Sequence, residues 1–174
     1  MIVELPVDVK EMLEPGEEVV WVGKPVRKPF VLKAALPLLL FTPFIIGPLI
    51  LLAAAPQAFG GPIPLLFFLF WYGSLSFVAL APLYNLLVWK NVFYILTNRR
   101  VIVRKGLIGI DYDILDLENV QQVNVDVGFW DRLYGTGTII IQSIGVTPVR
   151  LNNVEKPRLV QRILRDRVMK RRGG

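Results

Sequence analysis

Residues 91–105 read NVFYILTNRRVIVRK, two runs of β-branched and aromatic residues around a short polar break. Runs of this kind are typical of strands, and a polar break of three residues is typical of a hairpin turn. We therefore expect strands at Asn91–Thr97 and Val101–Lys105. Asn98 is expected to adopt the left-handed turn conformation between them.

The pattern of short strands continues after this hairpin. In Ile110–Ile114 three apolar side chains alternate with two aspartates, and the alternation slips at Leu115–Leu117, which predicts a bulge or bend. Valines alternate with polar residues over 122–127, and further strands are expected at Thr138–Ser143 and Val149–Leu151. The sequence therefore predicts an antiparallel meander of about six strands.

An amphipathic helix is expected after these strands. Pro157 suits the first position of a helix. Five apolar side chains follow at helical spacing and form one stripe: Leu159, Val160, Ile163, Leu164 and Val168. We expect the helix to cover about residues 157–168 and to cap the sheet.

Residues 34–89, which precede the strands, carry no charged side chain. About 20 residues cross a bilayer, so this run is long enough for two spans. The two glycines and two prolines of 56–62 predict a turn between helices at 34–55 and 63–89. Basic residues flank both helices and none lies in the turn. We therefore expect a multi-pass protein of the cell membrane, integral through two spans, with its N- and C-termini in the cytoplasm.

The composition limits the chemistry of the chain. It has 174 residues with a net charge of +6, and it contains neither cysteine nor histidine. Disulfides, thiolate metal ligands and cysteine nucleophiles are excluded, and the commonest general base is missing. We therefore expect no catalytic residues, no metal site and no cofactor, and we do not expect an enzyme. Outside the apolar run there is room for one domain, made of the N-terminal segment 1–33 and residues 90–174.

The order of several short motifs resembles the prokaryotic pleckstrin-homology-like membrane proteins, which carry a bacterial PH domain beside a membrane hairpin. The matching motifs are Leu13-Glu14-Pro15-Gly16-Glu17, Trp21-Val22-Gly23-Lys24-Pro25, Tyr94-Ile95-Leu96-Thr97-Asn98-Arg99-Arg100-Val101-Ile102 and Arg132-Leu133-Tyr134-Gly135-Thr136-Gly137. The resemblance implies a mainly β fold: a strongly bent, PH-like antiparallel sheet or barrel capped by the C-terminal helix. It also implies an extra strand at 17–23 and a role in binding or scaffolding.

Three groups of residues are candidates for contact with a lipid or a partner. The first is the basic hairpin Arg99, Arg100, Arg104 and Lys105, which either binds anionic lipid headgroups or serves as a cationic flank that sets topology. The second is Arg158, Arg162 and Arg165. For these a solvated helix face is favoured over nucleic acid, because no aromatic residues are interleaved with them. The third is the pair Phe129 and Trp130, placed either in the core or against the membrane or a partner.

These features support two hypotheses from different classes. In the first, a two-helix hairpin anchors a PH-like module at the cytoplasmic face, alone or as a homo-oligomer, where it meets anionic lipid, a protein partner or both. In the second, the protein is an accessory subunit of a larger membrane complex, and its kinked helices pack on partner helices.

Overall fold

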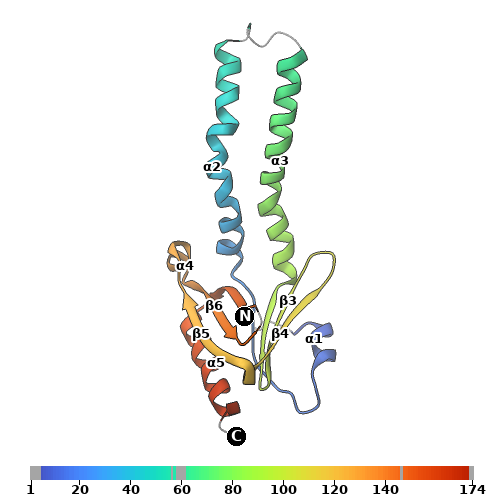
Figure 1. Ribbon diagram of the computed structural model, residues 1–174, viewed down its shortest axis with the longest axis vertical. Coiled ribbons are helices and arrows are strands. Elements are labelled where there is room, and N and C mark those ends of the chain that lie inside the picture. Colours follow the sequence, from blue (N-terminus) through green and yellow to red (C-terminus); the bar gives the residue numbers. More distant parts are fainter. Residues whose placement is uncertain (1–4, 56, 58–61, 146, 173–174) are drawn as a thin grey trace. The chain divides into compact units, whose positions relative to one another are not determined.

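The structure is a computed structural model that describes residues 5–55, 57, 62–145 and 147–172 (Figure 1). The chain divides into two compact units. The first, Met1–Phe30 with Leu87–Gly174, contains the seven strands found in the described residues and is called the β-rich unit. The second, Val31–Leu86, is called the helical unit. The apolar run of the sequence thus forms a separate unit inserted into the chain of the other.

The first sheet of the β-rich unit is antiparallel, in the order β1-β2-β3-β4. Its strands are β1 (Val19–Gly23), β2 (Phe93–Thr97), β3 (Arg100–Lys105) and β4 (Asp111–Asp116). The hairpin predicted over 91–105 corresponds to β2 and β3. Strand β1 precedes the apolar run yet pairs with β2, with Gly23 opposite Tyr94.

The turn of this hairpin differs from the prediction in one respect. Asn98 does not have a positive φ, so its expected left-handed conformation is wrong. Its side chain instead binds the N-terminal segment. The Glu18 amide donates to Asn98 Oδ1 (3.1 Å), and Asn98 Nδ2 donates to the Gly16 carbonyl (3.2 Å). Asparagine is required here for cross-strand hydrogen bonds rather than for backbone freedom.

The predicted bulge at 115–117 is also absent, because β4 pairs with β3 in unbroken register from Asp111 to Asp116. The first sheet has apolar residues on both faces, which explains the slip in the pattern. Leu115 faces the main core, whereas Tyr112 packs on a second cluster formed by Val9, Ile95 and Ile102. Helix α1 (Val7–Met12) supplies Val9. The bend comes after β4, at the 3₁₀ turn η2 (Leu117–Asn119).

The second sheet is antiparallel in the order β5-β6-β7. Its strands are β5 (Val120–Asp126), β6 (Thr136–Ser143) and β7 (Val149–Glu155), and the short helix α4 (Phe129–Tyr134) connects β5 to β6. Helix α5 (Pro157–Arg172) lies along this sheet (Figure 1) and buries Val160, Leu164 and Val168. The main core lies between the two sheets and α5.

The expectation of one bent sheet or barrel in a mainly β chain needs correction. Among the described residues the strands form two separate sheets, and β4 is not paired with β5. In the part of the chain that the structure describes, more residues lie in helices than in strands, because two of the helices are very long. Strands dominate only in the β-rich unit.

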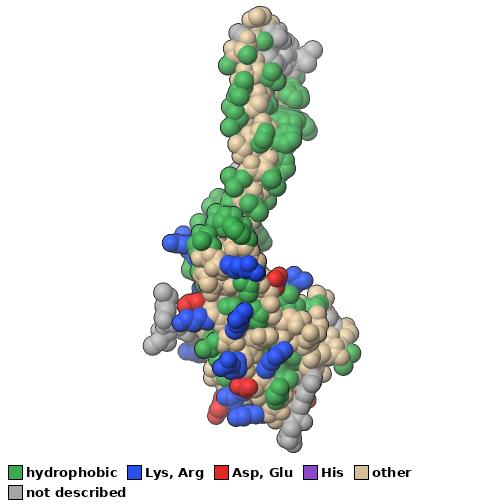
Figure 2. Space-filling view, turned by 90° about the vertical axis from the view of Figure 1, so that its left-hand side faces the viewer, with side chains coloured by type: hydrophobic (Ala, Val, Ile, Leu, Met, Phe, Trp, Pro, Cys, Tyr) green, Lys and Arg blue, Asp and Glu red, His purple; other side chains and the backbone are tan. Residues whose placement is uncertain are grey.

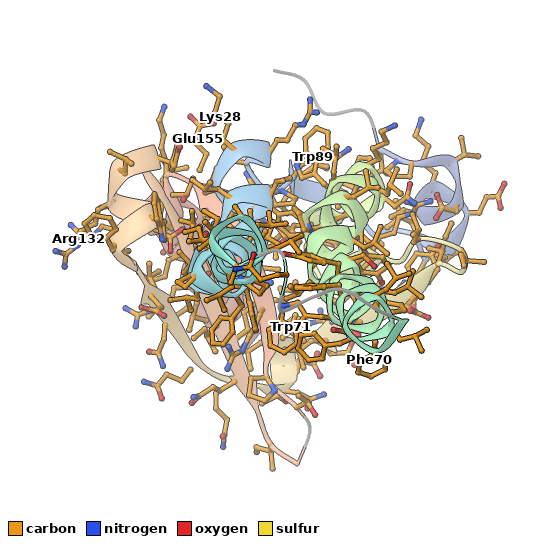
Figure 3. The ribbon with its side chains drawn as sticks, turned by 90° about the horizontal axis from the view of Figure 1, so that it is seen from above. Lys28, Phe70, Trp71, Trp89, Arg132 and Glu155 are labelled. Carbon is orange, nitrogen blue, oxygen red and sulfur yellow. The ribbon has the colours of Figure 1, made fainter. Side chains whose placement is uncertain are left out.

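The helical unit consists mostly of α2 (Arg27–Ala54) and α3 (Pro62–Asn91). Both are long and apolar enough to cross a membrane. Most of the predicted turn at 56–62 lies outside the described residues. Trp71 points from α3 toward α2, whereas Phe70 points away (Figure 3). Trp71 Nε1 donates to the Phe44 carbonyl (3.0 Å). Pro48, four residues later, has no N–H to offer that carbonyl, so Trp71 replaces a hydrogen bond that α2 lacks.

Candidate functional site

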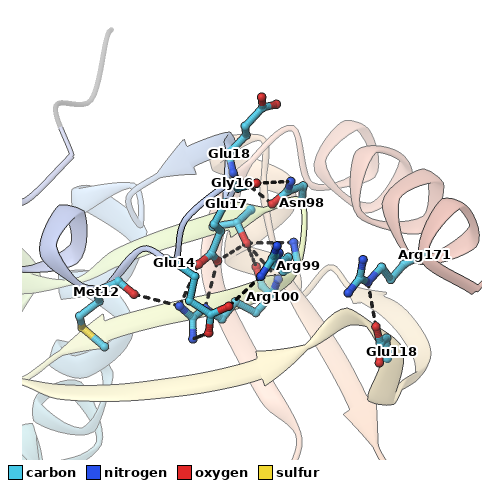
Figure 4. A network of polar contacts seen from close by, with 11 residues as sticks. Met12, Glu14, Gly16, Glu17, Glu18, Asn98, Arg99, Arg100, Glu118 and Arg171 are labelled. Atoms are coloured by element: carbon cyan, nitrogen blue, oxygen red, sulfur yellow. Dashed lines mark hydrogen bonds and ion pairs between the residues drawn. The ribbon is translucent and has the colours of Figure 1, made fainter.

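The basic hairpin binds the N-terminal segment of its own chain (Figure 4). Arg100 donates through Nε to Glu17 Oε1 (3.0 Å) and through Nη2 to Glu17 Oε2 (2.8 Å). A further bond joins Arg100 Nη2 to the Met12 carbonyl (2.9 Å). The Glu17 side chain is 0% exposed and that of Arg100 is 15% exposed. This pair is therefore a buried structural contact.

The other three basic residues of the hairpin are also paired. Arg99 contacts Glu14 (2.8 Å), Arg104 contacts Asp8 (2.6 Å) and Lys105 contacts Asp113 (2.5 Å). Three of the four acidic partners belong to the segment 5–23 that precedes the helices. The hairpin thus fastens this segment across the first sheet, and much of its charge is neutralised within the chain.

These contacts shift the pKa of two carboxyl groups. Burial alone would raise the pKa of Glu17, but the hydrogen bonds from Arg100, the Glu14 amide and Thr97 outweigh it and hold the pKa below its usual value of 4.5. Burial likewise opposes the hydrogen bonds of Tyr112 and Arg104 at Asp8, and the bonds prevail, so that its pKa lies below 3.8. Both carboxylates are therefore stabilised in the folded state.

The lowered pKa values predict sensitivity to acid. A carboxyl whose folded pKa lies below its unfolded value contributes stability that is fully present above the unfolded value, here 4.5 for Glu17 and 3.8 for Asp8, and lost as the pH falls through the folded value. We expect the free energy of unfolding to fall from about pH 5 downward. Urea unfolding of the full chain in detergent at several pH values measures this. Glu17→Gln should flatten the slope, and an unchanged slope would contradict the assignment.

The start of α2 and the end of α3 are tied together within the β-rich unit. Trp89 Nε1 donates to the Pro25 carbonyl (2.6 Å), and Lys24 Nζ donates to the Lys90 carbonyl (2.9 Å). Lys24 also lies over the rings of Phe93 (4.1 Å) and Trp89 (5.0 Å). Burial, followed by repulsion from Arg104, lowers the pKa of Lys24. The start of α2 and the end of α3 are thus held close to β1 and β2.

A different group of basic residues lines a groove beside α5. A hollow of about 640 Å³ lies between α4 and the start of α5, and one of about 660 Å³ continues it along α5 and β5. Both are lined by Val127, Arg158 and Arg162, and we call them together the α5 groove. Its other basic residues are Arg132, Lys156 and Arg165. Lys and Arg gather on the face shown in Figure 2, the side of the molecule that carries α4 and α5.

Helix α4 presents an apolar surface at one end of this groove. Phe129 is 78% exposed and Leu133, four residues later on the same side of the helix, is 67% exposed. Trp130 is half-buried and meets the Phe129 ring edge-on, with 5.5 Å between ring centroids. The structure thus places Phe129 at the surface and Trp130 at its margin.

A buried carboxylate holds α4 in place. Asp131 accepts hydrogen bonds from the Gly128 amide (3.2 Å), Thr136 Oγ1 (2.8 Å) and Asn153 Nδ2 (3.0 Å). Asn153 has a positive φ of 52° at a bulge in β7, where it and Asn152 oppose a single residue of β6. Its carbonyl accepts from the Val26 amide (2.9 Å). A chain of hydrogen bonds therefore connects α4 to the residue that precedes α2.

The structure separates the candidate residues into two groups. Arg99, Arg100, Arg104 and Lys105 lie on the first sheet in ion pairs, whereas Arg158, Arg162 and Arg165 lie in the α5 groove. Sequence analysis missed Arg132 and Lys156, which the fold brings to the same groove. The sequence gives one local signal that Lys156 lies at the start of α5, because it directly precedes the proline that begins this helix. Lys156 has a positive φ of 49°.

The comparisons with known proteins gave one match. A family model described as Bacterial PH domain matches residues 31–168, which is more than half of the chain. Neither the curated proteins nor the solved structures gave a match to this chain.

Proposed function

Because the chain belongs to the bacterial PH domain family, we propose that it is a membrane-anchored binding module held at the cytoplasmic face by its two apolar helices. PH domains are in general binding or scaffolding modules, and the chain contains neither cysteine nor histidine. The proposal therefore assigns the protein a binding role rather than a catalytic one.

The observation that carries the proposal is the insertion of the apolar helices between two paired strands. Gly23 of β1 lies opposite Tyr94 of β2. Helix α2 begins at Arg27 and α3 ends at Asn91, so only a few residues separate each helix from the first sheet. If α2 and α3 span the bilayer, the PH domain cannot leave the membrane surface. Even weak binding sites on the domain would then be occupied by ligands at the membrane, because tethering raises the effective concentration.

The polar groups of α2 and α3 support a membrane environment. Trp71 satisfies the carbonyl that Pro48 leaves without its helical donor. The hydroxyls of Thr42, Ser74 and Ser76 donate to carbonyls of their own helices. Internal satisfaction of polar groups is what a bilayer requires of a spanning segment.

In this proposal helix α4 contacts the membrane surface. Its exposed Phe129 and Leu133 are connected through Asp131 and Asn153 to Val26, one residue before α2 begins. We therefore expect α4 to rest at the lipid–water interface, where apolar side chains next to Arg132 suit an anionic membrane.

Labelling of single cysteines tests the topology, because the natural chain has none. In spheroplasts, a membrane-impermeant maleimide should label Gln57→Cys, between the two helices, without disrupting the membrane. Gln121→Cys, on β5 of the PH domain, should react only after permeabilisation. Reaction of Gln121→Cys in intact spheroplasts would reverse the orientation. Release of the protein from membranes by alkaline carbonate would exclude the anchor.

A further inference from the structure

The α5 groove differs from the basic hairpin in the state of its charges. Among the described residues Arg132, Lys156, Arg158, Arg162 and Arg165 have no ion-pair partner. Two acidic residues line the groove, Asp131 and Asp166. Asp131 is buried and accepts hydrogen bonds from Thr136 and Asn153. The groove therefore has an excess of positive charge directed at solvent. Arg132, for example, points outward from α4 (Figure 3).

Apolar surface is interleaved with these charges. Val127, Pro157 and Leu159 line the part near α4, and Val125 and Met169 line the part along α5. A ligand that fits both features carries negative groups alternating with apolar ones. None of the described residues that line the groove is aromatic, so along its length it lacks the stacking surface that single-stranded nucleic acid uses.

An unpaired strand edge forms one wall. Strand β5 is the edge of the second sheet, and Asn124 and Val125 line the groove. Gln161 Nε2 donates to the Val123 carbonyl from α5 (2.8 Å), so this carbonyl points away from β6. Backbone groups alternate along a strand, and those of Val125 therefore point to the same edge. Arg165 Nη2 also donates to the Val123 carbonyl (3.5 Å), so the part of this edge that is open to a partner backbone is Val125 and Asp126, where β5 ends.

The length of the groove favours a peptide over a single headgroup. Arg158 and Met169 are eleven residues apart on α5, about 16 Å at a rise of 1.5 Å per residue. An extended chain covers that distance with about five residues. One phosphate group would engage only part of it.

We propose that the α5 groove binds an extended acidic segment of a protein partner, whose backbone pairs with the open end of the β5 edge at Val125 and Asp126. Acidic side chains of the segment pair with Arg158, Arg162 and Arg165, and apolar side chains between them contact Val127 and Leu159. The inference rests on the proposed function, because it names the partner of the binding module.

The test uses the full chain in phosphatidylcholine nanodiscs and a fluorescein-labelled peptide of ten residues in which Glu alternates with Leu. We expect saturable binding that weakens as salt is added, and much weaker binding of a matched peptide with Gln in place of Glu. Arg158→Glu with Arg162→Glu should weaken binding at least about tenfold. Lys10→Glu with Arg150→Glu changes the net charge equally outside the groove and should leave the affinity within about twofold.

A second probe tests the strand pairing without altering the protein. Two versions of the peptide carry N-methyl groups on alternate amides, one in each of the two possible registers. Each version cannot donate hydrogen bonds along one of its edges, and we expect one of the two to lose most of its affinity. Equal affinity of both registers and the unmodified peptide would overturn the backbone pairing. Equal affinity of the groove variant and the wild type would overturn the site.

Two further arms distinguish other occupants. Saturable binding of a water-soluble short-chain phosphatidylglycerol, without any binding of the acidic peptide, would replace the peptide with a lipid headgroup and overturn the proposal. Binding of a short DNA duplex in preference to the peptide would overturn it in favour of nucleic acid. The cysteine-labelling experiment reports only on which side of the membrane the PH domain lies. A correctly inserted chain that binds no peptide therefore contradicts the groove and leaves the anchor intact.

Discussion

Arg100→Ala is expected to lower the free energy of unfolding of the PH domain by about 3–5 kcal/mol. The substitution removes three hydrogen bonds, two to Glu17 and one to the Met12 carbonyl. It also leaves the Glu17 carboxylate, whose side chain is 0% exposed, without its counter-ion. Urea unfolding of the full chain in detergent at neutral pH, followed by tryptophan fluorescence, measures the loss.

Arg99→Ala is the matched control for this prediction. Arg99 is the neighbouring residue and also pairs with an acidic residue of the N-terminal segment, but it is 40% exposed. An exposed pair contributes about 0–1 kcal/mol, so this variant should unfold almost like the wild type. Adding Glu17→Gln to Arg100→Ala removes the buried charge and should recover part of the loss. Equal stability of the Arg99→Ala and Arg100→Ala variants would show that burial of Glu17 is not the cause.

The second large effect is expected at Asp131. Asp131→Ala removes the acceptor of Thr136 and Asn153, and a buried donor left without a partner costs about 1–3 kcal/mol. It also removes the acceptor of the Gly128 amide at the start of α4. Compared with the wild type, the variant should therefore show faster hydrogen exchange in Phe129–Tyr134 and a smaller change in β2 and β3.

Asp131→Asn separates the two roles of this carboxylate. The amide keeps one oxygen as an acceptor but loses the second, so we expect stability between that of the wild type and that of Asp131→Ala. An alanine variant with normal exchange in α4 and normal global stability would mean that Asp131 does not position the helix. A loss spread evenly over the domain would assign it to the core alone.

Part of the fold follows from local sequence patterns. The strands predicted at Asn91–Thr97 and Val101–Lys105 correspond to β2 and β3, because β-branched and aromatic residues suit a pleated surface, although Asn91 belongs to α3. The apolar stripe of α5 predicted its buried side for Val160, Ile163, Leu164 and Val168 but was wrong for Leu159, which is 55% exposed. The second apolar cluster was not recognised, although Phe93–Leu96 and Val101–Val103 are continuously apolar. Such runs indicate a strand buried on both faces rather than on one.

The candidate site was harder to predict, because ion pairing depends on contacts between distant residues. Arg99 and Arg158 are both arginines in short basic clusters, and nothing local separates them. One meets Glu14, 85 residues away in the sequence, and the other has no acidic partner among the described residues. Arg132 and Lys156 likewise join the α5 groove only because β6 and β7 bring α4 beside the start of α5.

The insertion of α2 and α3 between paired strands has a consequence for the order of folding. Strand β1 must wait for β2, which is synthesised about 70 residues later, and closing a flexible loop of that length costs more entropy than closing a short one. If the two helices associate first, the flexible loop that remains to be closed shortens to a few residues, which saves about 2 kcal/mol of closure free energy. We expect the helices to be assembled before the first sheet is completed. A chain whose helices fail to associate would then leave β1 and β2 as unpaired strand edges, which are exposed to aggregation.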